Sequence, residues 1–169
     1  LRQSVSGAYP KPCIAEMGGK NACLVTANAD LERAAHGIVR SAFGLSGQKC
    51  SALSRLYVDS SVADQLSGML KDKIAALQVG DPALLQNWMG PVTTANALSN
   101  YQSYVERLRQ DGGRILIGGE RLTDQDRAHG FFVAPTLAEA PAGHPLFREE
   151  MFLPIVMLCR VANREQAMQ

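Results

Sequence analysis

Hydrophobic positions along the chain follow two alternating periods, one typical of strands and one typical of helices. Residues 21–27, NACLVTA, form a short apolar run that predicts a buried strand. Residues 28–43 follow with apolar positions at helical spacing, Asp30 is suited to the N-cap, and Gly44 ends the pattern. Residues 54–59 then alternate as a strand does, and residues 61–77 read as an amphipathic helix.

The second half of the chain continues the same alternation. A proline-containing connector at 79–92 is followed by a predicted helix at 93–113, ended by Gly112, and by a predicted strand at 114–119. An extended stretch broken by Pro135 is predicted at 131–140, and a last buried strand at 153–161. Asn163 and Gln166 have the spacing of a capping box that opens a further helix. This order predicts an α/β domain with a largely parallel sheet and helices on both faces. In such sheets the chemistry is expected at the carboxyl ends of the strands.

Composition and charge exclude several classes of protein. The 169 residues suffice for one domain, and the net charge of +1 gives no overall attraction to nucleic acid. No apolar run approaches the roughly 20 residues of a membrane span. The four cysteines form no CxxC pair, so we expect no metal site, no disulfide framework and a reducing, cytoplasmic location.

Several familiar catalytic motifs are missing from the sequence. It contains no GxGxxG, HExxH or GxSxG motif. His36, His129 and His144 lie far apart and are expected to be surface or packing residues. A cysteine hydrolase that pairs a thiol with His129 or His144 stays open as an alternative, because folding brings distant residues together.

Cys50 lies in a loop-like run within FGLSGQKCSALSRLYV, between a predicted helix and a predicted strand. Glycines before it and Lys49 beside it favour an accessible thiolate, and backbone N–H groups of such a turn can hold an oxyanion. Two readings stay open, a nucleophile and an ordinary half-buried cysteine. The other three cysteines, Cys13, Cys23 and Cys159, sit in or beside apolar runs and are expected to be inert.

Glu16 is the candidate general base. It stands between an apolar stretch and a Gly-Gly turn, flanked by Ile14, Ala15 and Met17. We expect it to be partly desolvated, which would raise its pKa toward the range useful for a base. The alternative is a surface glutamate at the end of a strand.

A series of motifs resembles the aldehyde dehydrogenase superfamily. EMGGKN, with Cys50 in GQKCSA 34 residues after Glu16, resembles the Glu-Leu-Gly-Gly-Lys and Gly-Gln-x-Cys motifs of that family. The resemblance continues through GDP, MGPV, DGGRILIGG and GFFVAPTL and ends at REEMFLPIV. It covers nearly the whole chain in order, and the motifs together are highly specific.

The resemblance implies a role for each matched residue. Cys50 would attack the aldehyde carbonyl, its backbone N–H would supply half of the oxyanion hole, and Glu16 would activate the water that hydrolyses the thioester. NAD, or NADP, would be the cofactor. Glu150 matches the residue that holds the nicotinamide ribose, and Phe152 the aromatic residue near the nicotinamide. Met17 and Gly18 match the turn that meets the carboxamide.

The run SAFGLSGQKCSALSRLYV is most similar to the pyrroline-5-carboxylate dehydrogenase branch, which oxidises glutamate semialdehyde in proline breakdown. Ser51 would then help to hold the substrate carboxylate. Other semialdehyde or aliphatic aldehyde dehydrogenases, and an inactive structural relative, remain alternatives. One departure is Leu153, where the family has glycine, and it could disturb the nicotinamide end of the site.

The resemblance also bears on domain organisation and partners. Residues 1–169 are expected to be a single catalytic domain, cut from a longer chain whose nucleotide-binding domain lies elsewhere. The parent is expected to act on a small-molecule aldehyde and to form a homo-oligomer or part of a larger bifunctional chain. We expect no nucleic-acid partner.

Overall fold

The computed structural model describes residues 12–168, so the first eleven residues and the last residue of the predicted domain lie outside it. Strands and helices alternate through most of this range. In chain order they are β1 (Asn21–Val25), α1 (Leu31–Phe43), β2 (Leu53–Asp59), α2 (Ala63–Ala75), α3 (Ala95–Gln110), β3 (Arg114–Ile117), β4 (Thr136–Glu139), β5 (Ile155–Val161) and α4 (Arg164–Ala167). Three short 3₁₀ helices lie between them, η1 (Gly44–Gly47), η2 (Gln125–His129) and η3 (Pro145–Phe147).

The five strands form one sheet in the order β1-β2-β5-β4-β3. β1 with β2, β2 with β5, and β5 with β4 pair in parallel, while β3 pairs antiparallel with β4 at the edge. The predicted largely parallel α/β sheet is therefore confirmed. Parallel strands need crossover connections, and α1 supplies the one between β1 and β2.

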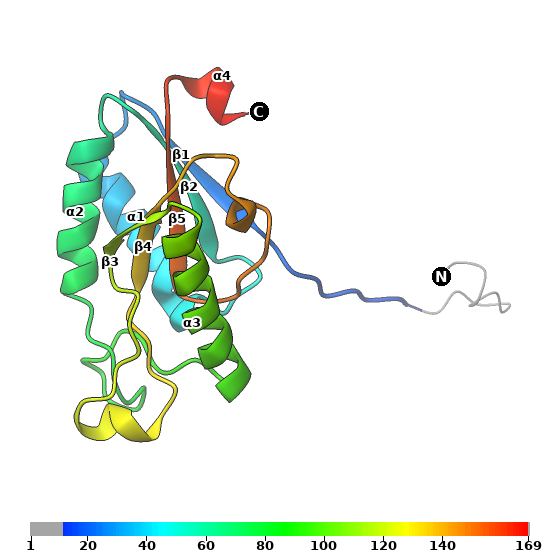
Figure 1. Ribbon diagram of the computed structural model, residues 1–169, viewed down its shortest axis with the longest axis vertical. Coiled ribbons are helices and arrows are strands. Elements are labelled where there is room, and N and C mark those ends of the chain that lie inside the picture. The colour runs from blue at the N-terminus through cyan, green and yellow to red at the C-terminus, as the bar shows by residue number, and fades with distance from the viewer. Residues whose placement is uncertain (1–11, 169) are drawn as a thin grey trace, which may run out of the picture.

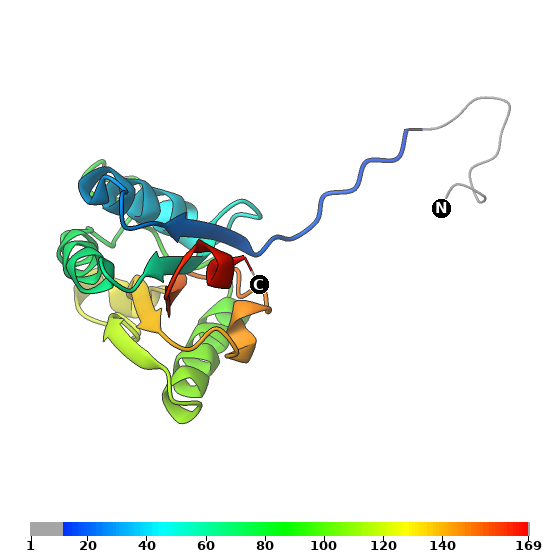
Figure 2. The ribbon, with the colours of Figure 1, turned by 90° about the horizontal axis from the view of Figure 1, so that it is seen from above.

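Helices cover both faces of the sheet, as expected. α1 and α2 lie on one face and α3 on the other (Figures 1 and 2). The pleat of β5 shows why this strand is continuously apolar: Val156 and Leu158 belong to the core under α1 and α2, whereas Ile155 and Met157 belong to the core under α3. A strand buried on both faces has no polar side to show in its sequence.

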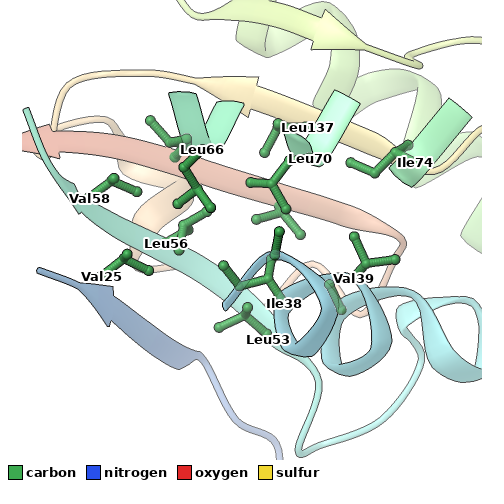
Figure 3. Packing of buried hydrophobic residues seen from close by; sticks show 14 of the residues in the cluster. Val25, Ile38, Val39, Leu53, Leu56, Val58, Leu66, Leu70, Ile74 and Leu137 are labelled. Carbon is green, nitrogen blue, oxygen red and sulfur yellow. The ribbon is translucent and has the colours of Figure 1, made fainter. Parts of the chain in front are cut away.

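The core beneath α1 and α2 is built from aliphatic side chains of both helices and of the sheet (Figure 3). Leu56 of β2 faces Leu66 and Leu70 of α2, and all three are fully buried. Each such side chain stabilises the fold by about 1.5–3 kcal/mol relative to its exposed form. This core fixes the ends of β1 and β2, from which the candidate site residues extend.

The predicted helix starts have the expected caps. The Asp30 carboxylate accepts the backbone N–H of Arg33 at 3.1 Å, and the Asn163 side chain accepts that of Gln166 at 2.9 Å. Thr94 caps α3 in the same way, accepting from Ala97 at 3.1 Å. Each cap satisfies one backbone donor that the first turn of a helix leaves free.

The extended stretch 131–140 is only partly a strand. β4 is limited to Thr136–Glu139, because Pro135 cannot donate to a ladder. A buried polar cluster occupies the preceding turn, where the Tyr101 hydroxyl donates to the Ala134 carbonyl at 2.8 Å and accepts the Gly119 N–H at 3.1 Å. Side-chain hydrogen bonds from α3 therefore hold the part of this stretch that precedes β4, in place of strand pairing.

Within residues 12–168, no helix is both long and apolar enough to cross a membrane.

Candidate active site

The loop that carries Cys50 is strained and firmly held. Leu45, Ser46 and Gly47 have φ values of 53°, 55° and 68°, so the chain makes a left-handed turn directly after α1. Left-handed backbone is uncommon for residues other than glycine and costs on the order of 1–3 kcal/mol each at such sites. The Ser46 hydroxyl donates to the Gly90 carbonyl at 2.9 Å, which ties this turn to the connector between α2 and α3.

A second tie lies two residues closer to the cysteine. The Gln48 side chain accepts the backbone N–H of Thr93 at 3.0 Å, and its amide donates to the Thr93 hydroxyl at 3.3 Å. Cys50 follows at the tip of the loop and is exposed. The fold thus presents the thiol on a rigid support, as nucleophilic attack requires.

The backbone of Cys50 is fixed from the side of β1. The Asn21 side-chain amide donates to the Cys50 carbonyl at 2.7 Å and to the Ala52 carbonyl at 3.1 Å. Among residues 12–168, no acceptor takes the backbone N–H of Cys50. The carbonyl is therefore occupied while the N–H is free to donate to an oxyanion.

Gly18 and Gly19 lie between the Cys50 loop and Glu150. The Gly19 N–H donates to Glu150 Oε1 at 2.9 Å. A Cβ on Gly18 would collide with the Glu150 carboxylate, and a Cβ on Gly19 would collide with the Cys50 carbonyl oxygen. The close approach of the Cys50 backbone explains Gly19, and Gly18 leaves room for the Glu150 carboxylate.

Phe152 also has a left-handed backbone, with φ of 55°, and its side chain is 45% exposed. Leu153, the departure from the family pattern, turns inward and is buried in the core under α3. A small hollow of about 10 Å³, large enough for one water molecule, is lined by residues that include Gly19, Lys49, Glu150 and Phe152. Three of the sequence motifs, EMGGKN, GQKCSA and REEMFLPIV, thus meet at one place.

Two cations lie beside this hollow with buried nitrogens. Lys20 Nζ and Arg55 Nε are inaccessible to solvent, and neither has a hydrogen-bond partner within residues 12–168. Burial, and after it the Arg55 charge, lower the pKa of Lys20 to about 8 against the opposing effect of Glu149 and Glu150. Lys20 was not among the predicted site residues, although its position between a Gly-Gly turn and a buried strand was a signal in the sequence.

Glu16 and Met17 stand apart from this cluster. They belong to an extended arm, residues 12–20, that leaves the body of the molecule ahead of β1 (Figures 1 and 2). Glu16 is exposed and Met17 is 75% exposed. The expected desolvation of Glu16 is therefore wrong for this structure, because nothing in the described part of the chain covers residues 12–17 of the arm. Ser51 is exposed beside Cys50.

The gathered residues occupy the opposite edge of the sheet from the one expected. Gly18 and Gly19 precede β1, Cys50 precedes β2, and Glu150 and Phe152 precede β5. These three strands are parallel, so the residues meet at their amino ends. The expectation of a site at the carboxyl ends was wrong, because each motif lies in the loop that enters a strand rather than in the loop that leaves one.

The histidines offer little support for a cysteine hydrolase. His36 and His129 are exposed. His144 is buried, its Nδ1 accepts the backbone N–H of Leu146 at 3.2 Å, and its Nε2 lies 3.8 Å from Asp111. Burial lowers the pKa of His144 and keeps the ring neutral. The hydrogen bond of this ring stays within the loop before β5, and no histidine lines the hollow beside Lys49.

The other cysteines differ from Cys50 in their surroundings. Burial raises the pKa of Cys23 and of Cys159, which suppresses their thiolate forms. Cys13 is exposed in the arm, and all four cysteines are free thiols. Within residues 12–168, no group of three His, Cys, Asp or Glu side chains is arranged to hold a metal ion.

Comparison with known proteins agrees with the motifs. Residues 2–169 match the model of the aldehyde dehydrogenase family. The chain belongs to this family. It is 42% identical over 160 residues to 1-pyrroline-5-carboxylate dehydrogenase of Geobacillus kaustophilus, covering 94% of this chain and 30% of that protein. It is 36% identical over 154 residues to the alpha-ketoglutaric semialdehyde dehydrogenase of Bacillus subtilis, covering 90% and 32%.

Solved aldehyde dehydrogenases share the fold. Betaine aldehyde dehydrogenase of Staphylococcus aureus, crystallised with NAD⁺, superimposes with a TM-score of 0.88 at 29% identity over 91% of this chain and 31% of that one. PnpE of a Pseudomonas species superimposes with a TM-score of 0.88 at 35% identity, over 90% of this chain and 31% of that one. The chain thus spans about 30% of the length of the relatives that it matches.

Proposed function

We propose that the protein containing this segment oxidises an aldehyde to a carboxylic acid through a thioester on Cys50, with NAD or NADP as electron acceptor. The observation that carries the proposal is the exposed Cys50, held through its carbonyl by Asn21 beside the Gly18–Gly19 turn. Family membership supplies the reaction type. Residues 1–169 are then part of the catalytic domain, and the nucleotide-binding domain belongs to the rest of the parent chain.

The Cys50 thiolate attacks the aldehyde carbon and gives a thiohemiacetal. Its oxygen carries negative charge during the attack, and the free backbone N–H of Cys50 is suited to stabilise it. Loss of hydride from the carbon leaves a thioester, and water then releases the carboxylic acid and the free thiol. Overall one aldehyde, one water and one oxidised cofactor give one carboxylate, one reduced cofactor and two protons.

Glu16 is proposed to activate that water. Its place on the exposed arm means that it works only when the rest of the parent chain packs the arm against the body. The turn at Gly18 and Gly19, two residues further on, already touches Cys50 and Glu150, so the arm is anchored close to the thiol. A water-filled position between Glu16 and the thioester is the arrangement that general-base catalysis needs.

The residues beside the hollow fit a nicotinamide cofactor. The exposed Glu150 carboxylate retains acceptor capacity for the two hydroxyls of a ribose, and the half-exposed Phe152 ring offers an apolar surface for the nicotinamide. Met17 and Gly18 would approach the carboxamide through their backbone. When bound, the cofactor accepts the hydride. A related Staphylococcus aureus enzyme crystallised with NAD⁺ supports this class of cofactor.

We propose glutamate semialdehyde, an intermediate of proline breakdown, as the substrate, with Ser51 contributing to the hold on its carboxylate. The support is the 42% identity to 1-pyrroline-5-carboxylate dehydrogenase of Geobacillus kaustophilus. The 36% identity to an alpha-ketoglutaric semialdehyde dehydrogenase favours a second candidate, another semialdehyde that carries a carboxylate. The free cysteines favour a cytoplasmic parent, which we propose to be a homo-oligomer or part of a bifunctional chain.

The test uses the longest natural chain that contains this segment. It is mixed with NAD⁺ and glutamate semialdehyde while NADH absorbance is followed, and Cys50→Ala and Glu16→Gln are run in parallel. We expect NADH from the wild type, none from Cys50→Ala, and from Glu16→Gln a burst of NADH followed by slow deacylation. The isolated 169 residues are expected neither to bind NAD⁺ tightly nor to turn over.

Other outcomes separate the alternatives. Activity with a short aliphatic aldehyde but not with glutamate semialdehyde would keep the reaction and overturn the substrate. Cofactor-independent hydrolysis that is lost on changing His129 or His144 would favour a cysteine hydrolase. A folded parent that binds NAD⁺ but forms no NADH with any aldehyde would identify an inactive structural relative.

A further inference from the structure

Glu149 and Glu150 are neighbours in the sequence but have different surroundings. The Tyr104 hydroxyl donates to Glu149 Oε1 at 2.6 Å, and Arg107 Nη1 donates to Glu149 Oε2 at 3.0 Å. Both donors lie on α3, one turn apart. The Glu150 carboxylate instead accepts from Gly19 on the other side of the hollow. As a sequence, this pair reads as two solvated charges.

We propose that Glu149 is a positioning residue, whose attachment to α3 fixes the direction in which Glu150 meets the cofactor. The inference rests on the proposed function, because it deepens the role of Glu150. Its basis is geometric: one carboxylate ties the chain to α3, whose inner face is buried, and the next projects toward the Gly18–Gly19 turn.

The attachment is suited to hold a backbone in place. Both oxygens of Glu149 are engaged by different donors, so the carboxylate cannot rotate freely about its last bond. Hydrogen bonds to an ionised carboxylate are shorter and stronger than those between neutral groups. The supporting helix is itself rigid, since Tyr101, Val105 and Leu108 on α3 are buried in the core.

Both partners keep the charge that this contact needs. The hydrogen bond from Tyr104 lowers the pKa of Glu149, and Arg107 adds to that effect, so the carboxylate stays ionised in neutral solution. Burial and then the Glu149 contact raise the pKa of Tyr104 to about 12, so the phenol stays a donor. The contact is therefore expected to persist over the pH range in which the enzyme would work.

The loop before Glu149 also passes close to the end of the same helix. The buried His144 ring lies 3.8 Å from Asp111, the residue that caps α3, and its Nε2 has no hydrogen-bond partner in the described part of the chain. The hydrogen bonds of Glu149 are therefore the contacts that tie this loop to α3 next to the site. If Glu149 were merely structural, loosening it would lower stability and leave cofactor binding unchanged.

The experiment uses the full parent protein with Tyr104→Phe, Glu149→Gln and Glu150→Gln. Tyr104→Phe removes the 2.6 Å hydrogen bond and keeps the ring. The matched control is Glu139→Gln. It removes a carboxylate that accepts hydrogen bonds from Arg114 and Arg160 at the opposite end of the strands. For each variant we would measure kcat, KM for NAD⁺, KM for the aldehyde, direct NAD⁺ binding by calorimetry, and Tm.

We expect Tyr104→Phe and Glu149→Gln to raise KM and Kd for NAD⁺ by about 5- to 10-fold, with KM for the aldehyde changed less than twofold. Glu139→Gln should lower Tm and leave NAD⁺ binding unchanged. If the variants at Tyr104 and Glu149 lower Tm but leave NAD⁺ binding within twofold, while Glu150→Gln weakens it, the positioning role is overturned and the proposed function stands. If the folded wild type binds no NAD⁺ and Glu150→Gln changes nothing, the proposed function itself fails.

Discussion

In the part of the chain that the structure describes, charged side chains are paired at one end of the parallel strands, and two have a buried nitrogen without a partner at the other. The carboxyl edge is the end of the sheet where β2, β4 and β5 finish, and the amino edge is the end where β1, β2 and β5 begin. At the carboxyl edge, Arg160 donates to Glu139 and to Asp64, both at 2.7 Å, and Arg114 donates to Glu139 at 2.8 Å. At the amino edge, the buried nitrogens of Lys20 and Arg55 have no partner within residues 12–168. Within the described residues, the charges at the carboxyl ends are paired with one another, whereas two buried nitrogens at the amino ends have no hydrogen-bond partner.

Backbone conformation shows the same contrast. Four non-glycine residues in the described range have positive φ, and three of them, Leu45, Ser46 and Phe152, lie at the amino edge. Strain and unpaired polar groups are costly and persist where the surrounding structure forces them, which in proteins is often a functional site. The difference agrees with our proposal that the catalytic residues lie at the amino ends of the strands, whereas the ion pairs at the carboxyl ends contribute to stability. The predictions below, on the parent protein, test this division.

The largest expected effect is on catalysis at the amino edge. Gly19→Ala places a Cβ against the Cys50 carbonyl, so the nucleophile loop must shift. A displacement near 1 Å costs about 100-fold in rate, and we expect kcat to fall by at least that factor. The control is Gly37→Ala in α1, where a Cβ meets no atom within 4 Å and which should stabilise the fold by about 0.5–1 kcal/mol. Steady-state kinetics that show the two variants alike would contradict the division.

The second effect is on stability at the carboxyl edge. Arg160→Met removes the hydrogen bond to the largely buried Glu139 and one to the exposed Asp64. We expect the loss of the Glu139 contact to lower the free energy of unfolding by about 1 kcal/mol with kcat unchanged. Urea denaturation and kinetics on the same sample measure both. If Arg160→Met lost activity without losing stability, the carboxyl edge would not serve stability alone, and the division between the two edges would be wrong.

The pH dependence of that network has a defined sign. Burial alone would raise the pKa of Glu139, but the hydrogen bonds from Arg160 and Arg114 outweigh it and hold the pKa below 4.5. The stabilisation is therefore present above the ordinary carboxyl range and lost as pH falls through the lowered pKa. Below pH 4.5, wild-type stability should fall more steeply with acid than that of Arg160→Met.

A third prediction concerns the buried ammonium. The pKa of Lys20 is lowered to about 8, so between pH 8 and its ordinary 10.5 the unfolded chain binds more protons than the folded one. Wild-type stability should therefore rise with pH through this window. Lys20→Met should be more stable than wild type by about 1 kcal/mol at pH 7, and the gain should vanish toward pH 10.5. If wild type and Lys20→Met had the same denaturation midpoint at pH 7, the Lys20 ammonium would carry no cost of burial in the folded protein.

The smallest effect is the release of strain before Cys50. Leu45 has φ of 53° and is 74% exposed, so Leu45→Gly loses little packing and gains a favourable backbone. We expect the free energy of unfolding to rise by about 0.5 kcal/mol. Glycine relieves the cost of the left-handed conformation, but part of this gain is lost because glycine gives the unfolded chain more conformational entropy. Thermal unfolding checks this, and a variant less stable than wild type would show that the turn carries no strain.

Much of the fold was predictable from local patterns. The caps at Asp30 and Asn163, the strand at β5 and the largely parallel order all followed from spacing and hydrophobic period. β4 came out shorter than expected, because a proline and a buried tyrosine cluster replace ladder bonds there. The motif residues of the candidate site were found by resemblance, whereas Lys20, Tyr104 and the separate roles of Glu149 and Glu150 were not.

The sequence by itself determined which segments become strands and helices, and which family the motifs resemble, because both are written in residue type and short-range spacing. Only the tertiary structure decided that the motifs meet at the amino ends of β1, β2 and β5, that Glu16 stays exposed on the arm, and that Glu149 turns to α3 while Glu150 turns to Gly19. The contacts between these motifs and with α3 join residues that are 29 or more positions apart in the chain. Across such a separation, packing sets the direction of a side chain, and its neighbours in the chain do not.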